Sequence, residues 1–531
     1  MTSNCALVDY SMNCLLRLTV AVSAMLMAGD VFSASAQREI PPAFGPYVNL
    51  KPSDFAEAKS FRGTDRIVGT YYFYWYDALS KSHLIDGDGT DALTTHPPTL
   101  EGLSWKSAAW HRRQLEDMMA AGIDVVLPVF WGAPSEQGAP AHLHWSYEGL
   151  PPLVQAREEL LRAGKQPPRI GLFYDTSTLQ YNAWGEHLDL TTPRGREWFY
   201  ATVRDFFSLI PPRHWAMIND RPIVLLYSAS FAKAHDQSVV EQLRAEFPKQ
   251  FAGRVPWLAR EISWRVKTDS VVAWGGAMGL KNPGGVASVG PGYDHSAVPG
   301  RAPLIVERRG GAFYEEQWLK LLRRPVNFVM VETWNEWHEG TDVAESKEYG
   351  RTFIELTRKY SDLLKQGWRS PWPKGPYSDA KSVNITLGPV NRETGLRQIE
   401  NEDGQTAPAR LGERNARAVR RAPGQGHYLY FAVDDSFKAS DTTAFKLEVE
   451  YFDAGPGQLS VEFDGSDESA PFSGAYTRAT EIVALNGGKT WQKSAFTLQG
   501  AKFNNSQNRG ADFRLVVEAP TFAVGRVTLS R

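Results

Sequence analysis

Eight short segments rich in β-branched and aromatic residues recur between residues 67 and 331. Segments of this kind, about 4–8 residues long and bounded by polar turns, are typical of strands buried on both faces. Stretches whose apolar residues repeat with helical spacing separate several of them, and such alternation predicts a parallel sheet covered by helices. The predicted strands are Ile67 to Trp75, Val125 to Phe130, Arg169 to Tyr174, Pro222 to Tyr227, Trp257 to Ser263, Val271 to Trp274, Val286 to Val289, and Asn327 to Val331.

Parallel strands in this number predict a (β/α)8 TIM barrel, an α/β fold whose active site lies at the C-terminal ends of the strands. We expect the barrel over residues 45–370. Its helices are clearest at Ser107 to Ala121, Pro193 to Leu209, Val239 to Phe247, Tyr314 to Leu322, and Glu345 to Leu364. Several strands end in polar and aromatic residues, as this architecture predicts: Tyr72 to Asp77, Phe130 to Gly132, Tyr174-Asp175, and Pro291 to His295.

The eighth strand ends in the densest chemistry, because Val331 to Thr341 holds three glutamates, two tryptophans and a histidine. On a helical turn, Glu336 and Glu339 would have Cβ atoms roughly 5–6 Å apart. Retaining glycosidases hold their two carboxyl groups about 5–5.5 Å apart. Trp334 and Trp337 would offer flat apolar faces on which sugar rings stack. Carboxylates are also common in the first turn of a helix, where they complement its dipole, but the tryptophans and the position after a strand favour an acid–base site.

Four blocks together resemble glycoside hydrolase family 99, the family of endo-α-mannosidases and endo-α-mannanases. They occur in the family's order and cover roughly residues 65 to 365. Related barrels, the family 71 α-glucanases and the WbsX-type glycosyltransferases, share shorter versions of the Asn-Glu-Trp-x-Glu-Gly motif. The blocks are Tyr72 to Tyr76, Ala121 to Val126 with Trp131-Gly132, Gly290 to Asp294, and Trp334 to Thr341.

The resemblance implies a retaining endo-hydrolase that uses no metal or other cofactor and no enzyme nucleophile. Glu336 matches the base that deprotonates the substrate's 2-hydroxyl, which closes onto the anomeric carbon as a 1,2-anhydro sugar. Glu339 matches the acid that protonates the departing oxygen and then activates water. Tyr293 matches a tyrosine that lines the site. The residues predicted to bind substrate are Tyr74, Trp131, Tyr293, Asp294, Trp334, Trp337 and His338, with core packing an equal alternative for Tyr74 and Trp131.

Two departures from the family pattern concern the substrate. Asp342-Val343-Ala344 replaces the usual Gln-Ile-Glu, and Val298 to Arg301 stands where Arg-Pro-Trp-Asn usually follows the tyrosine. These changes affect the mannose-specific subsites, so mannan is one candidate among α-linked glycans. Asp86 to Asp91 is spaced like part of a calcium loop, but it lacks the required glycine at Asp91 and a distal glutamate.

The N-terminus has the features of a secretory signal peptide over residues 1–36. Arg17 precedes the apolar run Leu18 to Ala28, and Ala34-Ser35-Ala36 is a small-x-small cleavage site. Both cysteines of the sequence lie in this segment, so the mature chain would have no thiol. A net charge of −2 gives no electrostatic reason to expect nucleic acid or an anionic membrane as partner. We expect a secreted or periplasmic monomer that binds a polysaccharide or oligosaccharide.

A Pro/Gly-rich connector, residues 371–380, marks a domain boundary. From residue 381 to 531 short alternating segments are separated by turn residues, which predicts an antiparallel β-sandwich. A sandwich appended to an exported hydrolase is similar to a carbohydrate-binding module, and a purely structural domain is the alternative.

Two other functions fit the same architecture. One is a non-catalytic carbohydrate-binding protein, against which the presence of both glutamates argues. The other is a WbsX-like glycosyltransferase of polysaccharide assembly, against which the export signal argues, because sugar-nucleotide donors are cytoplasmic.

Overall fold

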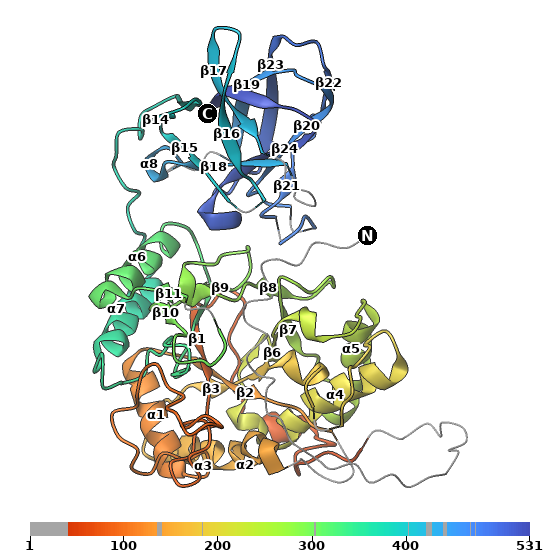
Figure 1. The fold of residues 1–531 in the computed structure, drawn as a ribbon. Helices are drawn as coiled ribbons and strands as arrows, with labels where there is room; N and C mark the ends of the chain where they lie inside the picture. Colours follow the sequence, from red (N-terminus) through yellow and green to blue (C-terminus); the bar gives the residue numbers. More distant parts are fainter. Residues whose placement is uncertain are drawn as a thin grey trace. The chain divides into compact units, whose positions relative to one another are not determined.

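The computed structural model describes residues 41–134, 141–182, 184–301, 304–401, 403–420, 427–438, 443–467, 469–472 and 474–531. The predicted signal peptide lies outside these residues. The described chain divides into two compact units, one made mainly of residues 41–369 and the other mainly of residues 370–531. In Figure 1 the first unit runs from red through green to teal and the second from teal to blue.

Eight parallel strands form the barrel of the first unit. Their order around the sheet is β8–β7–β6–β4–β2–β1–β12–β9, and a parallel bridge between Val272 and Val286 joins the two ends. Two short strands, β3 (Arg169–Ile170) and β5 (Met217–Ile218), extend this sheet. The barrel strands are β1 (Ile67–Tyr72), β2 (Val125–Phe130), β4 (Leu172–Tyr174), β6 (Arg221–Leu226), β7 (Trp257–Glu261), β8 (Ser270–Val272), β9 (Ala287–Val289) and β12 (Phe328–Val331).

Helices flank the strands of the barrel (Figure 1). A β-hairpin of β10 (Tyr293–Asp294) and β11 (Ile305–Val306) leaves the C-terminal end of β9. A short 3-10 helix, η7 (Gly276–Met278), follows β8. The helices are α1 (Ala108–Ala120), α2 (His144–Glu148), α3 (Leu150–Arg162), α4 (Pro193–Ser208), α5 (Ser238–Gln250), α6 (Ala312–Leu321) and α7 (Thr352–Gln366).

Local signals in the sequence set the ends of these helices. The Ser107 hydroxyl accepts a hydrogen bond from the Trp110 amide at 3.1 Å and caps α1. Thr192 caps α4 in the same way, and a proline follows it at the first helical position. Gly367, with φ of 78°, ends α7 in the left-handed conformation that glycine adopts without steric cost.

The predicted TIM barrel is confirmed, and all eight predicted strands are present. Three features differ from expectation. Helices α2 and α3 were not predicted, because α2 is only five residues long and the prolines in the first turn of α3 resemble a loop. No helix links β7 to β8. The last helix begins at Thr352 and not at Glu345, because residues 346–350 form a turn closed by a bridge between Ser346 and Gly350.

The second unit is an antiparallel β-sandwich with its own apolar core. One sheet has the order β14–β13–β25–β17–β16, with β19 pairing β25 and β23. The other has the order β15–β18–β24–β20–β21, with β22 on β20. A four-residue helix, α8 (Asp435–Lys438), follows β18. The strands are β13 (Ser382–Thr386), β14 (Arg392–Thr394), β15 (Leu396–Ile399), β16 (Thr406–Leu411), β17 (Arg414–Val419), β18 (Tyr428–Val433), β19 (Ala444–Phe452), β20 (Pro456–Phe463), β21 (Thr477–Arg478), β22 (Val483–Asn486), β23 (Trp491–Gln499), β24 (Phe513–Glu518) and β25 (Ala523–Ser530).

Among the described residues, no helix is both long and apolar enough to cross a membrane.

Candidate active site

The glutamate-rich motif leaves β12 as a loop and not as the helical turn that its spacing suggested. The loop is fixed against the end of β1, because the Asn335 side chain accepts from the Phe73 amide at 2.8 Å and donates to the Phe73 carbonyl at 2.7 Å. It also closes on itself, since the hydroxyls of Thr333 and Thr341 are 2.9 Å apart and the Thr333 amide donates to the Thr341 carbonyl. The side chains on this loop are therefore held on a rigid frame at the C-terminal end of the barrel.

Glu336 is buried, with 5% of its surface exposed. Its Oε1 lies 2.7 Å from Nδ1 of His338, and its Oε2 has no hydrogen-bond partner among the described residues. Burial raises the pKa of Glu336; the charge of His338 opposes this increase, and the nearby Glu339 carboxylate adds to it. The structure therefore brings the two glutamates within electrostatic reach of each other and leaves one buried oxygen of Glu336 without a hydrogen-bond partner among the described residues.

His338 is held on both sides of its ring. Its Nε2 donates to the backbone carbonyl of His83 at 2.9 Å, while Nδ1 faces Glu336. Burial lowers the pKa of His338, but the Glu336 carboxylate outweighs that effect, and the pKa is raised overall. The sequence predicted a substrate contact for His338; both of its ring nitrogens have protein partners.

Glu339 is more exposed and has a different cation as partner. Its Oε1 accepts from Nη1 of Arg301 at 2.7 Å, and the two side chains are 21% and 9% exposed. The Tyr293 hydroxyl lies 3.0 Å from Nδ1 of His295 and 3.5 Å from Nη1 of Arg301. Burial raises the pKa of Tyr293, and the Glu339 charge adds to the increase. The predicted residues Glu339 and Tyr293 thus belong to one cluster, in which Arg301 is an unpredicted member.

Asp294 supports this cluster through its backbone. Its amide donates to the Glu339 carbonyl at 2.9 Å. Its carboxylate accepts from the Ser296 amide at 2.8 Å and closes a local turn. The predicted Asp294 therefore positions the main chain that carries Glu339.

The indoles of the motif and Tyr74 are packing residues in this structure. Trp334 and Trp337 are 0% and 1% exposed, and Trp337 packs on Tyr76 with ring centroids 4.7 Å apart. Tyr74 is 2% exposed and donates its hydroxyl hydrogen to a backbone carbonyl at 2.7 Å. None of the three offers an exposed ring face. The stacking faces expected at Trp334 and Trp337 are therefore buried, and these rings stabilise the loop.

Partly exposed aromatic side chains lie beside His338 of the glutamate loop, where the ring centroids of Trp75 and His338 are 5.8 Å apart. Trp75 stacks on the His83 ring with centroids 4.6 Å apart and an interplanar angle of 7°. Trp131 stands edge-on to Trp75 at 6.1 Å and donates its indole N–H to Asp175 at 2.7 Å. Burial raises the pKa of Asp175. Trp131 was among the residues predicted to bind substrate. Trp75 was not, although its place in the aromatic run at the end of the first strand could have indicated it. His83 is an isolated loop residue, and no pattern in the sequence indicates it.

Two further carboxyl groups are buried at strand ends. Glu332 follows β12, and its Oε2 accepts from the Gly275 amide at 2.9 Å. Burial raises its pKa to about 7, and the hydrogen bond from Gly275 opposes the increase. Glu261 ends β7 and accepts from the Ser263 amide at 2.8 Å. The Glu332 carboxyl thus joins two loops of the barrel, and the Glu261 carboxyl closes a local turn.

In the described part of the chain, no group of three or more His, Cys, Asp or Glu side chains is arranged to hold a metal ion. In the calcium-like segment Asp86 to Asp91, the carboxylates of Asp88 and Asp91 have protein partners, whereas Oδ2 of Asp86 is buried without a hydrogen-bond partner among the described residues. Asp88 accepts from the Thr90 amide at 2.9 Å and hydroxyl at 2.6 Å. Asp91 lies 3.0 Å from Nε2 of His96.

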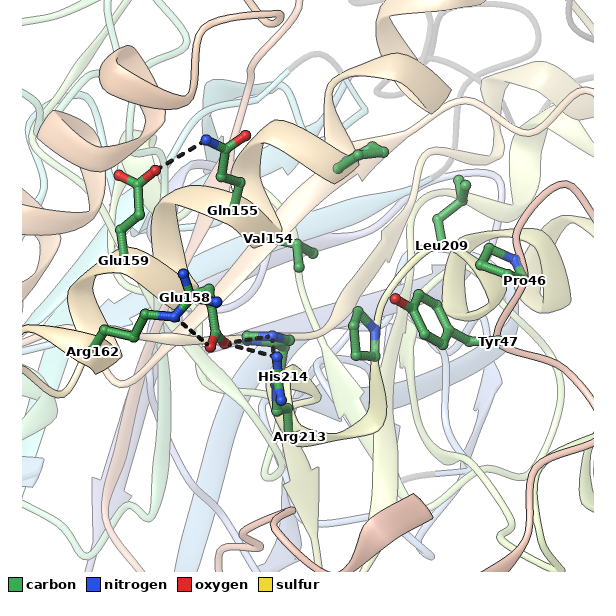
Figure 2. A pocket seen from close by; sticks show the side chains of 12 residues that line it. Pro46, Tyr47, Val154, Gln155, Glu158, Glu159, Arg162, Leu209, Arg213 and His214 are labelled. Atoms are coloured by element: carbon green, nitrogen blue, oxygen red, sulfur yellow. Dashed lines mark hydrogen bonds and ion pairs between the residues drawn. The ribbon is translucent and has the colours of Figure 1, made fainter.

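Figure 2 shows a cavity of about 470 Å³ in another part of the barrel unit. It is lined by α3 and by the segment after α4, where Arg213 and His214 turn toward Glu158 at 3.1 and 3.5 Å. This segment leads into β5 and β6, and so enters the barrel at the N-terminal ends of the strands. That end of a TIM barrel serves stability, and no residue of the glutamate cluster lines the cavity.

Comparison with known proteins gives both a family and a more distant relative. Residues 56–385 match the family model described as "Domain of unknown function (DUF5010)". The mouse (Mus musculus) glycoprotein endo-alpha-1,2-mannosidase is 30% identical over 96 residues, which are 15% of this chain. The match spans 21% of the mouse protein, well under two thirds of its length.

Two solved structures are each similar to part of the chain. The GH99 endo-alpha-mannosidase from Bacteroides thetaiotaomicron is 14% identical, with a TM-score of 0.44, and the alignment covers 57% of this chain and 98% of that enzyme. The C-terminal CBM6 of LamC from Zobellia galactanivorans is 10% identical, with a TM-score of 0.17 and coverage of 28% and 99%. Because the family model spans more than half of the sequence, the chain belongs to the DUF5010 family.

Proposed function

We propose that this protein is a glycoside hydrolase that cleaves an α-linked glycan within its chain and retains the anomeric configuration. The observation that carries the proposal is the pair of glutamates on one rigid loop at the end of β12. Glu336 is buried beside His338 with one oxygen unpartnered, whereas Glu339 is more exposed and ion-paired to Arg301. Two carboxyls in different environments can take different roles in proton transfer. The short match to the mouse endo-mannosidase supports the same class of reaction.

In the first step, Oε2 of Glu336 takes the proton of the sugar's 2-hydroxyl. The freed 2-oxygen forms a bond to the anomeric carbon, and the glycosidic bond breaks with its electron pair going to the departing oxygen. That oxygen takes the proton of Glu339, which must therefore have exchanged its ion pair with Arg301 for a proton before this step. The products of the step are a 1,2-anhydro sugar, a protonated Glu336 and an ionised Glu339.

In the second step, the roles of the two side chains reverse. The Glu339 carboxylate takes a proton from water as the water oxygen attacks the anomeric carbon. The bond from the 2-oxygen to that carbon breaks, and the 2-oxygen takes back its proton from Glu336. Two displacements at one carbon leave its configuration unchanged, and both glutamates return to their starting states.

The aromatic residues beside the glutamate loop suit a sugar substrate. Trp75 and Trp131 keep part of their rings exposed next to the glutamate loop, and indole faces bind the C–H surface of a pyranose. We also propose export of the protein, on the strength of the signal-peptide pattern in residues 1–36, and glycan binding by the sandwich.

The test is product analysis on a panel of α-linked mannans, glucans and acidic glycans. We expect internal cleavage of at least one, with the newly formed reducing end initially in the α configuration by ¹H NMR. Glu336→Gln and Glu339→Gln should each reduce turnover by about 10²- to 10⁴-fold, the usual value of acid–base assistance. Glu159→Gln on α3 serves as the carboxylate control and should retain full activity. Binding without cleavage across the panel would instead identify a non-catalytic glycan-binding protein.

A further inference from the structure

The contacts of His338 fix where its protons are. A backbone carbonyl can only accept a hydrogen bond, so Nε2, at 2.9 Å from the His83 carbonyl, carries a hydrogen. The 2.7 Å contact between Nδ1 and Oε1 of Glu336 also needs a proton between the two atoms, since two lone pairs at that distance would repel. His338 and Glu336 therefore share one proton on this line, whichever of the two formally holds it.

The anchor on the other side of the ring is built into the backbone. His83 has φ of 57°, in the left-handed region that residues other than glycine rarely adopt, and its ring stacks on Trp75. Burial lowers the pKa of His83 to about 3, with the charge of His338 adding to the decrease, so the His83 ring is neutral at physiological pH. Of the two histidines, His338 is therefore the one that can carry a positive charge beside Glu336.

Other charged and titratable groups also face the pair. Glu339 faces both members and acts against the ionisation of Glu336. The hydroxyl of Tyr76 lies 3.3 Å from Nδ1 of His338. The remaining groups are Tyr293 on β10, which faces Glu336, and Asp86 in the loop after β1, which faces His338.

We propose that Glu336 and His338 work as one proton-holding unit, in which the His83 carbonyl fixes the ring so that the imidazolium keeps Oε2 of Glu336 free of a resting proton. This inference rests on the proposed role of Glu336 as the base. His338 is then a positioning residue: the shared proton stays between Oε1 and Nδ1 throughout the reaction. The proton from the sugar's 2-hydroxyl arrives on Oε2 and leaves from it again.

The unit solves a difficulty that burial creates. A buried carboxyl next to a second carboxylate tends to stay protonated, and a protonated Glu336 could not accept the proton of the 2-hydroxyl. The fixed positive charge of His338 offsets this tendency. Without the charge of His338, Glu336 would ionise, and so could accept the proton of the 2-hydroxyl, only at higher pH.

A substrate-free experiment tests the unit directly. Long-range ¹H–¹⁵N NMR of protein with ¹⁵N-labelled histidine reports the protonation of each ring nitrogen, and His338→Asn assigns the His338 signal by its loss. We expect both nitrogens of His338 to be protonated at pH 7.5, and Glu336→Gln to return the ring to its neutral form at that pH. A neutral His338 ring in the wild-type protein at pH 7.5 would overturn the proposal.

His83→Gly is the matched control for the anchor. Glycine keeps both the carbonyl and the left-handed backbone and removes only the ring. We expect the two His338 nitrogens to stay protonated in this variant. Loss of the imidazolium signal would show that the His83 ring, and not its carbonyl, holds the unit together.

Kinetics then separate a charge effect from a structural one. His338→Asn preserves a neutral donor near Glu336, and His338→Gln preserves one near the His83 carbonyl. Both should lower kcat/KM about a hundredfold on the acid side of the profile and less than tenfold at pH 9, because higher pH ionises Glu336 without help. An equal loss at every pH would contradict the proposal. Absence of cleavage by the wild-type protein would count against the proposed function, while the NMR result would still decide the proton-holding unit.

Discussion

Glu332 shows how strongly the barrel interior acts on a single side chain. It is 1% exposed, and burial raises its pKa from 4.5 to about 7. Between these two pH values the folded protein holds a proton that the unfolded chain releases. The free energy of unfolding should therefore fall as the pH rises from about 4.5 to 7 and level off above that range.

Glu332→Gln removes this titration and keeps an acceptor for the Gly275 amide. The variant should gain stability relative to wild type on going from pH 5 to pH 8, by up to about 3 kcal/mol, since one pKa unit corresponds to about 1.4 kcal/mol. Urea unfolding of both proteins at the two pH values measures this gain. The titration of other buried carboxyls affects both proteins equally and cancels in the comparison. If the free energies of unfolding of the variant and the wild type differed by the same amount at both pH values, Glu332 would not be protonated in the folded state.

The role of a site residue depended on its neighbours more than on its type. Glu336 and Glu339 could be chosen from their spacing after a strand, yet the same motif gave no way to tell that Trp334 and Trp337 are buried. An indole that faces the core and one that faces a sugar have the same sequence signal. Arg301 could not be predicted to meet Glu339 either, because a loop and a hairpin bring together residues 38 positions apart.

At the level of elements, the strands were predictable because their burial on both faces leaves continuous apolar runs. Every residue of β1 and β2 is buried. The connections were less predictable. The prolines in the first turn of α3 are typical of a loop, so this helix was not predicted. The polar residues 345–351 were predicted as the first turns of the last helix, which begins at Thr352. Loop geometry follows from tertiary contacts that local patterns do not encode.

Gly290, at the end of β9, lies where the chain passes close to the backbone of Glu332 and Ala277. A Cβ at this position would lie 2.1 Å from the Glu332 carbonyl oxygen and 2.6 Å from the Ala277 Cα, both of them backbone atoms. Gly290→Ala should therefore cost at least the roughly 1–3 kcal/mol of an overpacked core. The control Gly87→Ala adds a Cβ with no atom within 4 Å and should unfold within about 0.5 kcal/mol of wild type. Equal denaturation midpoints for the two variants would refute the close approach.

In the described part of the chain, the main apolar core of the barrel lies within residues 55–364. The sandwich has its main core within residues 383–529 and a smaller buried cluster within residues 399–511. Because the barrel core and the sandwich core have no residue in common, we expect each unit to fold alone. A fragment of residues 371–531 should show a cooperative thermal transition by circular dichroism. A fragment of residues 41–369 should keep turnover of soluble glycan and lose retention on insoluble glycan. Aggregation of the barrel fragment would favour a purely structural role for the sandwich.

The central claim is the division of labour between Glu336 and Glu339, and the dependence of the cleavage step on the leaving group tests it most directly. Single-turnover rates would be measured for wild type, Glu336→Gln and Glu339→Gln on an aryl glycoside with an acidic leaving group and on the corresponding sugar-linked substrate. We predict that Glu339→Gln cleaves the aryl glycoside within about tenfold of wild type but loses about 10²- to 10⁴-fold on the sugar-linked one. Glu336→Gln should fail on both. Equal losses of Glu339→Gln on the two substrates, or an unimpaired Glu336→Gln, would contradict the assigned roles.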